Sequence, residues 1–319
     1  MASSSFVWPM GYLATFGPRA DPVTTLTWGL LAISCAVTAI ITLLVLVGTV
    51  LRRQKTADAP VFEPRSGPAW ITWGLTLTVA ALAICVVWTA QVLAAVDSPA
   101  TKPAVTIEVT GHQWWWEARY VGANPGEDFV TANELHIPVG QPVRIRLKAA
   151  DVIHSFWAPG LAGKTDTIPG RTNLTWMQAD KPGVYRGQCT EYCGLQHAHM
   201  ALYVSADAPG DYAAWAGREA AAAGTPADPE ALQGEQVFVQ RCGKCHTVRG
   251  SAAAGTQGPD LTHLAARQTL AAGLLPNTVG NLEGWMLNPQ ALKPGAAMPP
   301  VRLSAVELHA VTAYLEGLS

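Results

Sequence analysis

Four side chains that bind soft metals lie in one short stretch of the chain, residues 188–200. Cys189 and Cys193 are four residues apart, His197 follows four residues later, and Met200 comes three after that. Thiolates, an imidazole and a thioether favour copper over hard cations. Two other interpretations stay open for this stretch alone. One is a disulfide between the two cysteines, and the other is a zinc site, which Met200 and the uneven spacing fit poorly.

A second chemical motif lies near the C-terminus, where residues 242–246 read Cys-Gly-Lys-Cys-His. This is the attachment motif of c-type haem, with Cys242 and Cys245 as the thioether-forming residues and His246 as the proximal ligand. A thioredoxin-like Cys-x-x-Cys would need a strand–helix context that is absent here. Met298 is the predicted sixth ligand, because Met/His ligation raises the reduction potential into the range of electron carriers. Met286 competes for this role, but its helix-like, Trp-containing stretch favours core packing.

Two upstream segments extend the first motif into a family resemblance. Residues 151–157 read Asp-Val-Ile-His-Ser-Phe-Trp, and residues 163–171 read Gly-Lys-Thr-Asp-Thr-Ile-Pro-Gly-Arg. Together with the Cys/His/Met cluster, they make residues from about 23 to 207 resemble cytochrome c oxidase subunit II, which carries a binuclear copper (CuA) centre. Residues from about 230 to the end are similar to a class I cytochrome c.

The resemblance implies a full set of copper ligands. Cys189 and Cys193 would bridge two copper ions. His154 and Met200 would complete one copper, and His197 with the backbone carbonyl of Glu191 would complete the other. The carboxylate of Glu191 is also expected to ligate magnesium at the contact with subunit I.

An aromatic run, residues 111–116, supplies three consecutive tryptophans. The resemblance implies that Trp114 lies exposed above the copper centre and is the point where electrons reach it. For Trp115 and Trp116 we expect barrel core and interface positions. In the haem unit, the resemblance implies that the carbonyl of Pro259 holds the proximal imidazole.

The remaining histidines are assigned no metal. His199 is expected in solvent or behind the ligands, and His263 and His309 on the surface. His112 and His136 are likewise left without a metal.

Two long uncharged runs precede these motifs, at residues 23–51 and 67–96. Each exceeds the roughly 20 residues that span a bilayer. The loop between them carries Arg52, Arg53, Lys55 and Arg65. An excess of cations in a short loop places it in the cytoplasm. Both termini and the metal-binding segments are therefore expected on the outer, periplasmic side of a bacterial inner membrane.

From residue 105 the pattern changes to short alternating segments separated by turn residues, which predict strands. Several strands without helical periodicity indicate a sandwich or barrel, and the resemblance implies a cupredoxin-like Greek-key barrel. The apolar face of residues 303–318 predicts a closing helix. The predicted strands are 105–110, 134–139, 143–147, 173–177, 183–187 and 201–205.

The expected fold is multidomain: a two-helix transmembrane hairpin, an all-β cupredoxin-like barrel and a small all-α cytochrome c domain. A net charge of −2 suggests no nucleic-acid partner. The predicted divisions are 1–22 as an extracytoplasmic lead, 23–97 as the hairpin, 98–207 as the copper domain, 208–229 as a linker and 230–319 as the cytochrome domain.

The resemblance implies the electron-input subunit of a haem–copper oxidase. A soluble cytochrome c or another reduced donor would supply electrons, which would pass through haem c and copper to subunit I. Oxygen is reduced there with proton translocation, and subunit III is a further expected partner. Two alternatives stay open. One is the electron-receiving subunit of a CuA-containing nitric oxide reductase, and the other is a membrane-anchored electron carrier or copper-handling protein without an oxidase partner.

Overall fold

The computed structural model describes residues 7–8, 10–53, 69–122 and 128–319. It divides into two compact units, one made of residues 21–98 and the other of residues 1–20 with 99–319. Lys55 and Arg65, on which part of the predicted orientation depends, lie outside the described residues.

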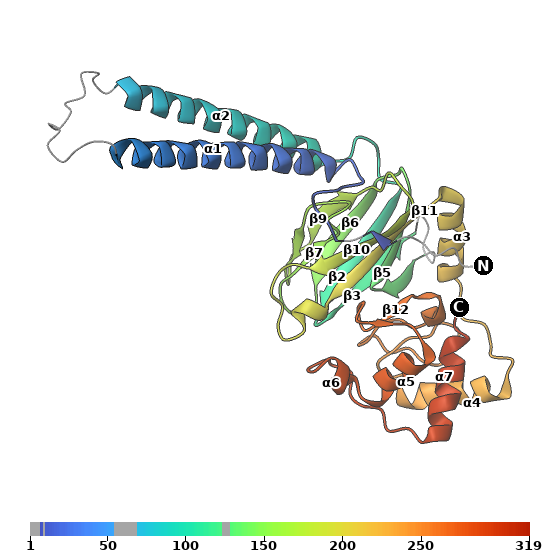
Figure 1. Cartoon of the computed structure of the whole chain (residues 1–319). Helices are drawn as coiled ribbons and strands as arrows, with labels where there is room; N and C mark the ends of the chain where they lie inside the picture. The colour runs from blue at the N-terminus through green and yellow to red at the C-terminus, as the bar shows by residue number, and fades with distance from the viewer. Residues whose placement is uncertain (1–6, 9, 54–68, 123–127) are drawn as a thin grey trace. The chain divides into compact units, whose positions relative to one another are not determined.

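The smaller unit is a pair of helices, α1 (Asp21–Arg53) and α2 (Ala69–Asp97), which lie beside each other (Figure 1). Both are long and apolar enough to cross a membrane. Gly29 allows the close approach of the pair, because a Cβ at this position would lie 2.2 Å from the ring of Trp88. Most of the large apolar side chains of these helices are exposed, as a lipid environment would favour.

The copper domain consists of two β-sheets that enclose an apolar core. In one sheet the strand order is β5-β11-β10-β7-β8, with the short β1 beside β10, and in the other it is β4-β3-β2-β6-β9. The strands are β1 (Val7–Trp8), β2 (Val105–His112), β3 (Trp115–Val121), β4 (Phe129–Ala132), β5 (Glu134–Pro138), β6 (Val143–Ala149), β7 (His154–Trp157), β8 (Thr165–Thr167), β9 (Asn173–Met177), β10 (Gly183–Cys189) and β11 (Ala201–Asp207).

Alternation of apolar and polar residues explains how these strands bury one face. In β2 and β6 every second side chain points inward, so that Ile107, Val109, Ile145 and Leu147 are fully buried. Parallel pairing of β2 with β6 places Ile107 beside Ile145 and Val109 beside Leu147. The sheets therefore form a rigid frame, and the metal-ligating loops extend from it.

The helix α3 (Pro209–Ala220) follows the last strand and belongs to the copper domain rather than to a free linker. Its Trp215 stacks on His136 with ring centroids 4.1 Å apart and also packs edge-on against Tyr120. The predicted linker 208–229 therefore includes a helix that is anchored to the barrel. At the other end of the chain, the N-terminal segment also packs on this domain, because Phe16 exchanges backbone hydrogen bonds with Gly160 and Asp180.

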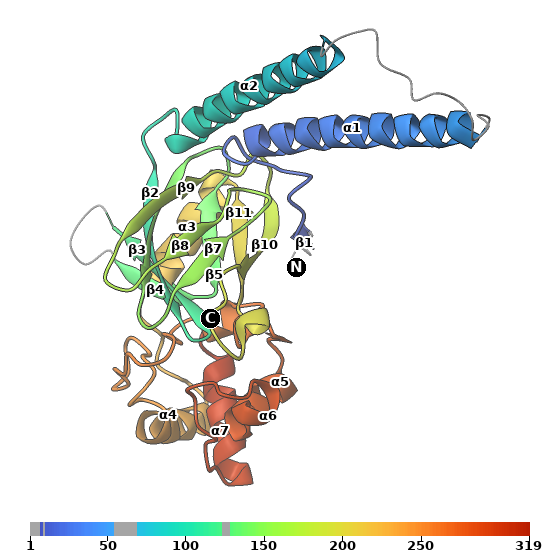
Figure 2. The same ribbon diagram turned by 90° about the vertical axis from the view of Figure 1, so that its left-hand side faces the viewer.

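The haem domain is mainly helical and lies at one end of the two sheets (Figure 2). Its largest packing contact joins α4 to α7, where a Cβ on Gly234 would lie 1.9 Å from the carbonyl oxygen of Ala310. Asp228 caps α4, and Ser304 with Glu307 forms a capping box at the start of α7. The elements are α4 (Pro229–Arg241), β12 (Thr269–Leu270), β13 (Leu275–Pro276), α5 (Val279–Leu287), α6 (Pro289–Leu292) and α7 (Ala305–Glu316).

Candidate metal centres

The predicted copper ligands lie together where β7, β10 and the loop before β11 meet. The Sγ atoms of Cys189 and Cys193 are 3.7 Å apart, and both residues are free thiols. The Sγ of Cys193 also lies 3.6 Å from Nδ1 of His197 and 3.8 Å from Sδ of Met200. Ligand atoms of His154, Cys189 and Cys193 all lie within 4.8 Å of one another. Soft donors that converge in this way are well suited to copper.

His154 is oriented so that one ring nitrogen is available to a metal. Its Nε2 contacts the Asp151 carboxylate at 2.7 Å, whereas its buried Nδ1 has no hydrogen-bond partner among the described residues. A buried ring nitrogen without a partner is what a metal ligand needs, and the carboxylate fixes the ring from the other side. Burial lowers the pKa of His154, but Cys189 and Asp151 outweigh it and raise the pKa overall. Gly111 leaves room for the ring, since a Cβ there would lie 2.7 Å from it.

The two thiols cannot both ionise easily without a cation. Hydrogen bonding with Cys193 lowers the pKa of Cys189 to about 4. Hydrogen bonding with Cys189, together with burial, raises the pKa of Cys193. A coordinating metal removes the proton from a thiol, so copper would stabilise both thiolates. The donor set therefore fits the binuclear copper centre that the resemblance implies.

Backbone contacts hold the ligand loop against the sheet. The amide of Cys189 donates to the carbonyl of Met200 at 2.9 Å, and the amide of Thr190 donates to Ser155 at 3.1 Å. The carbonyl of Glu191 lies 3.3 Å from Sγ of Cys189. Because the loop begins and ends on paired strands, its ligands keep their positions without relying on loop stiffness.

Trp114 corrects one expectation, because it is only 8% exposed rather than lying open above the copper site. Its indole Nε1 donates to the carbonyl of Cys193 at 3.0 Å. A segment of the haem domain lies over its ring, and a Cβ on Gly295 would be 3.5 Å from it. Trp116 is fully buried in the barrel core, and Trp115 is half-buried at a cavity of the haem domain.

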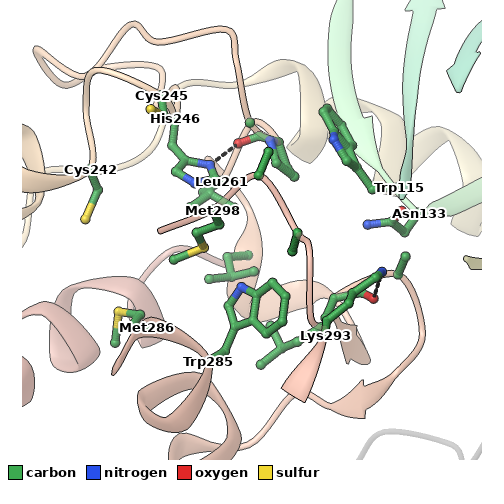
Figure 3. Close-up of a pocket in the computed structure, with 18 of the residues that line it drawn as sticks. Trp115, Asn133, Cys242, Cys245, His246, Leu261, Trp285, Met286, Lys293 and Met298 are labelled. Carbon is green, nitrogen blue, oxygen red and sulfur yellow. Dashed lines mark hydrogen bonds between the residues drawn. The ribbon is translucent and has the colours of Figure 1, made fainter. Parts of the chain in front are cut away.

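The haem domain contains a cavity around the predicted haem residues (Figure 3). Its atom-free space is about 1240 Å³, part of which opens to solvent. Ligand cavities are mostly apolar with a few placed polar groups, and the lining of this cavity has that character. Its lining combines the predicted ligands with apolar side chains, and it includes Cys242, Cys245, His246, Met298, Met286, Phe238, Leu282, Trp285 and Leu315.

The proximal histidine is oriented by a contact of its Nδ1, the ring nitrogen that would not ligate iron. Nδ1 of His246 contacts the carbonyl oxygen of Pro259 at 2.8 Å, which leaves Nε2 for iron. Burial lowers the pKa of His246, which favours the neutral ring that can ligate a metal. Gly258 lies against the ring, where a Cβ would be 2.5 Å from Cε1. The residues present therefore fit a covalently attached haem.

Both candidate methionines line this cavity. Met298 follows a short loop after α6 and is half-buried, whereas Met286 lies on α5 and is 4% exposed within the apolar core (Figure 3). The cavity alone does not distinguish them, so the assignment of Met298 stays a prediction.

The other histidines differ in their surroundings. The expectation for His263 is wrong: it is 5% exposed, and its Nε2 contacts the carbonyl of Ala221 at 3.1 Å, because the end of the α3 segment covers it. His309 is exposed on α7. His199 is exposed and contacts the side-chain carbonyl of Gln196, and His112 stacks on Trp115 at 4.3 Å between ring centroids.

Two residues near the metal sites have roles that the sequence did not suggest. Asp151 orients His154, and its position three residues before a ligand was the available signal. Lys293 contacts backbone carbonyls of both domains. No sequence pattern indicates this contact, because its partners lie 94 and 179 residues away in the copper domain.

Comparison with known proteins assigns a family to each of the two domains. Residues 123–207 match the family described as cytochrome C oxidase subunit II, periplasmic domain, and residues 231–319 match the cytochrome c family. The cytochrome c oxidase subunit 2 of Alkalihalophilus pseudofirmus is 43% identical over 216 residues, covering 67% of this chain and 61% of the relative. That of Bacillus sp. strain PS3 is 32% identical over 241 residues, covering 72% of this chain and 66% of the relative.

A solved structure is also similar. It is the periplasmic domain of subunit II of the cytochrome oxidase of Bradyrhizobium japonicum, at 33% identity and a TM-score of 0.35. The match covers 38% of this chain and 96% of the solved one. The match with the two bacterial subunit 2 relatives named above covers about two thirds or less of the length of those relatives.

The fold and the sites define a class of protein in which a cupredoxin-like copper domain follows two apolar helices and precedes a cytochrome c domain. The chain belongs to the cytochrome c oxidase subunit II family. Its first family implies a CuA copper centre and its second implies haem.

Proposed function

We propose that this chain is the subunit through which electrons enter a membrane-bound haem–copper oxidase. The single observation that supports this most strongly is that one compact unit holds both a soft-ligand cluster and a cavity lined by the predicted haem-attachment residues. When bound, haem c and CuA supply one-electron redox chemistry, and the chain's own residues bind and orient them. The oxygen-reducing site would be on subunit I.

The proposed copper ligands are the six residues that the family pattern names. Cys189 and Cys193 would bridge, with the orphan Nδ1 of His154 and the imidazole of His197 at the two ends. Met200 and the carbonyl of Glu191 complete the set. Two shared thiolates would let both coppers share one unit of charge, and the loop held by paired strands would keep the ligands in place, so little would have to move during electron transfer.

The proposed haem ligands are His246 and Met298, with thioether bonds to Cys242 and Cys245. The carbonyl of Pro259 orients the proximal ring, and Met298 would raise the reduction potential relative to a water-ligated or histidine-ligated iron. Magnesium at the carboxylate of Glu191 stays a prediction that needs subunit I, since the cluster of potential ligands in the described residues does not include that carboxylate.

The proposed topology places the N-terminal segment and both metal domains on the periplasmic side. Two spanning helices return the chain to the side on which it began. The N-terminal segment packs on the copper domain through Phe16, which supports a common side for the two. We also propose the domain limits given above, with α3 assigned to the copper domain.

Purification of the complex with its haem and metal inventory would test this proposal. The expected inventory is two coppers and one covalent haem on this chain, with further haems on a co-purifying subunit I. Donor-supported oxygen consumption should be lost in Cys193→Ser and retained in a matched Ser155→Ala variant, whose buried hydroxyl is not a predicted ligand. Consumption of nitric oxide in place of oxygen, or purification of the chain without any haem-containing partner, would contradict the proposal.

A further inference from the structure

Lys293 is a buried cation at the contact between the two metal domains. It is 2% exposed and lies directly after α6 in the haem domain. Its Nζ donates to the carbonyls of Trp114 and His199 in the copper domain and of Ala271 in its own domain, each at 2.8 Å. An ammonium group has three protons, so all three donors are satisfied, two of them across the interface and one within the haem domain.

The burial of Lys293 is costly unless these contacts are maintained. Burial lowers the pKa of Lys293 to about 7, and a negative charge on Cys193 would act in the opposite direction. Among the described residues no carboxylate forms an ion pair with Lys293. A buried donor that lost its acceptors would destabilise the interface more than a well-packed apolar side chain would.

The segment that begins at Lys293 also contacts the copper-ligand loop. The side-chain amide of Gln196 donates to the carbonyl of Pro294 at 2.8 Å. A Cβ on Gly295 would lie 3.3 Å from the side chain of Leu195, so the two loops are in close contact. The same segment ends at Met298, the predicted sixth haem ligand. Residues 293–298 therefore connect the copper-ligand loop directly to the haem cavity.

A second element of the haem domain supports the same contact. The carboxylate of Glu134 accepts hydrogen bonds from the amides of Gln268 and Thr269 and from the Thr269 hydroxyl. The amide of Ala201 donates across the interface to the carbonyl of Ala272 at 3.1 Å.

The backbone at this turn adopts a disfavoured conformation. Ala271 and Ala272 have φ angles of 55° and 63°, a region that residues with a side chain seldom occupy. Their carbonyls are the ones that bind Lys293 and Ala201. Strained backbone persists where the surroundings hold it, so this turn is shaped by the contact between the domains.

We propose that Lys293 is a positioning residue that locks the haem domain onto the copper-ligand loop, so that the two metal sites face each other in one fixed geometry. This inference rests on the proposed function, because a fixed geometry matters only if electrons pass between the two sites. It also means that the face of Trp114 is covered by this chain's own haem domain. An external donor must then approach the haem domain on another face.

Amide hydrogen exchange on the complete, metal-loaded complex can detect the lock without measuring activity. Lys293→Met removes the charged donor and keeps the length of the side chain. The amides of Ala201, Gln268 and Thr269 report on the interface, because their acceptors lie in the opposite domain. We expect them to exchange about tenfold faster or more in Lys293→Met. Arg302→Met, which removes an exposed cation from the same domain, should leave them unchanged.

A variant on the opposite side of the interface controls for local misfolding of the haem domain. Glu134→Ala removes the acceptor of the second contact from the copper domain and leaves the haem domain's sequence intact. It should also accelerate exchange at Ala201, which keeps its own acceptor. Unchanged exchange in both variants would overturn the lock.

The electron-transfer rate then tests whether the lock has a role beyond structure. In Lys293→Met, transfer from haem to copper should slow by about tenfold or more while the haem spectrum and both potentials stay as in the wild type. Faster exchange with an unchanged transfer rate would overturn the positioning role. If the wild-type complex itself showed no transfer between the sites, the proposed function would fail, whereas the exchange result would still test the contact independently.

Discussion

In the copper domain the predicted ligand atoms lie against one another, whereas in the haem domain the predicted ligands line an open cavity. The Sγ atoms of Cys189 and Cys193 are 3.7 Å apart, and the loop that carries Cys193 begins and ends on paired strands, so the copper site is formed by the fold itself. Around His246, apolar side chains surround a space that protein atoms do not fill. One site is thus preorganised by a sheet, and the other needs its cofactor to complete the domain core.

The largest expected effect of this difference is on the haem domain. Replacing Cys242 and Cys245 by Ala should prevent covalent attachment of haem, so that no cofactor is fixed in the cavity. We expect the haem domain to lose at least about 4 kcal/mol of stability, the gain that a tightly bound ligand gives a folded state. The barrel should keep its copper spectrum. Scanning calorimetry with limited proteolysis measures both domains, and an unchanged haem-domain transition would contradict the comparison.

A smaller effect is expected from the two methionines of the cavity. Met298→Ala should leave haem covalently bound, lower its reduction potential and open the sixth position to carbon monoxide. Met286→Ala is the matched control. It should cost about 2–5 kcal/mol of stability as a buried core truncation, with the sixth position still closed. If carbon monoxide binds only after Met286→Ala, the two assignments must be exchanged.

The smallest effect on folding is expected at the copper site. Cys193→Ser should abolish the mixed-valence binuclear spectrum, because one bridging thiolate is lost. Since the strands hold the loop without metal, the metal-free barrel should change in stability by no more than about 1 kcal/mol. Thermal melting of metal-free protein checks this. Unfolding of the wild-type barrel on removal of its metal would show that copper, and not the sheet, organises the site.

Much of the barrel could be predicted from the sequence, because alternation is a local signal. The six predicted strands correspond to β2, β5, β6, β9, β10 and β11. The strands β1, β3, β4, β7 and β8 were missed. Three consecutive tryptophans hide the alternation in β3, and the predicted ligand His154 interrupts it in β7. Within the copper site, Cys189, Cys193, His197 and Met200 were predicted as metal-binding from their types and spacing, whereas His154 and Glu191 were assigned only through the family resemblance.

The contact between the domains could not be predicted in this way. Trp114 is buried because residues 293–298 cover it, and Lys293 finds acceptors far away in sequence. Such contacts depend on the complementarity of the surfaces of two folded domains, and neither composition nor periodicity indicates that complementarity. The same holds for His263, which was expected on the surface and is buried by the segment after α3.

Flash reduction of the complete complex can follow the order of electron transfer from haem to copper, because the two cofactors absorb at different wavelengths. We predict that haem is reduced first, and that copper is then reduced at a rate independent of protein concentration. Trp114→Phe should slow the reduction of copper by haem while both cofactors stay bound, because it removes the hydrogen bond that the indole Nε1 donates to the Cys193 carbonyl. Reduction of copper before haem, with no effect of Trp114→Phe on either rate, would contradict the account.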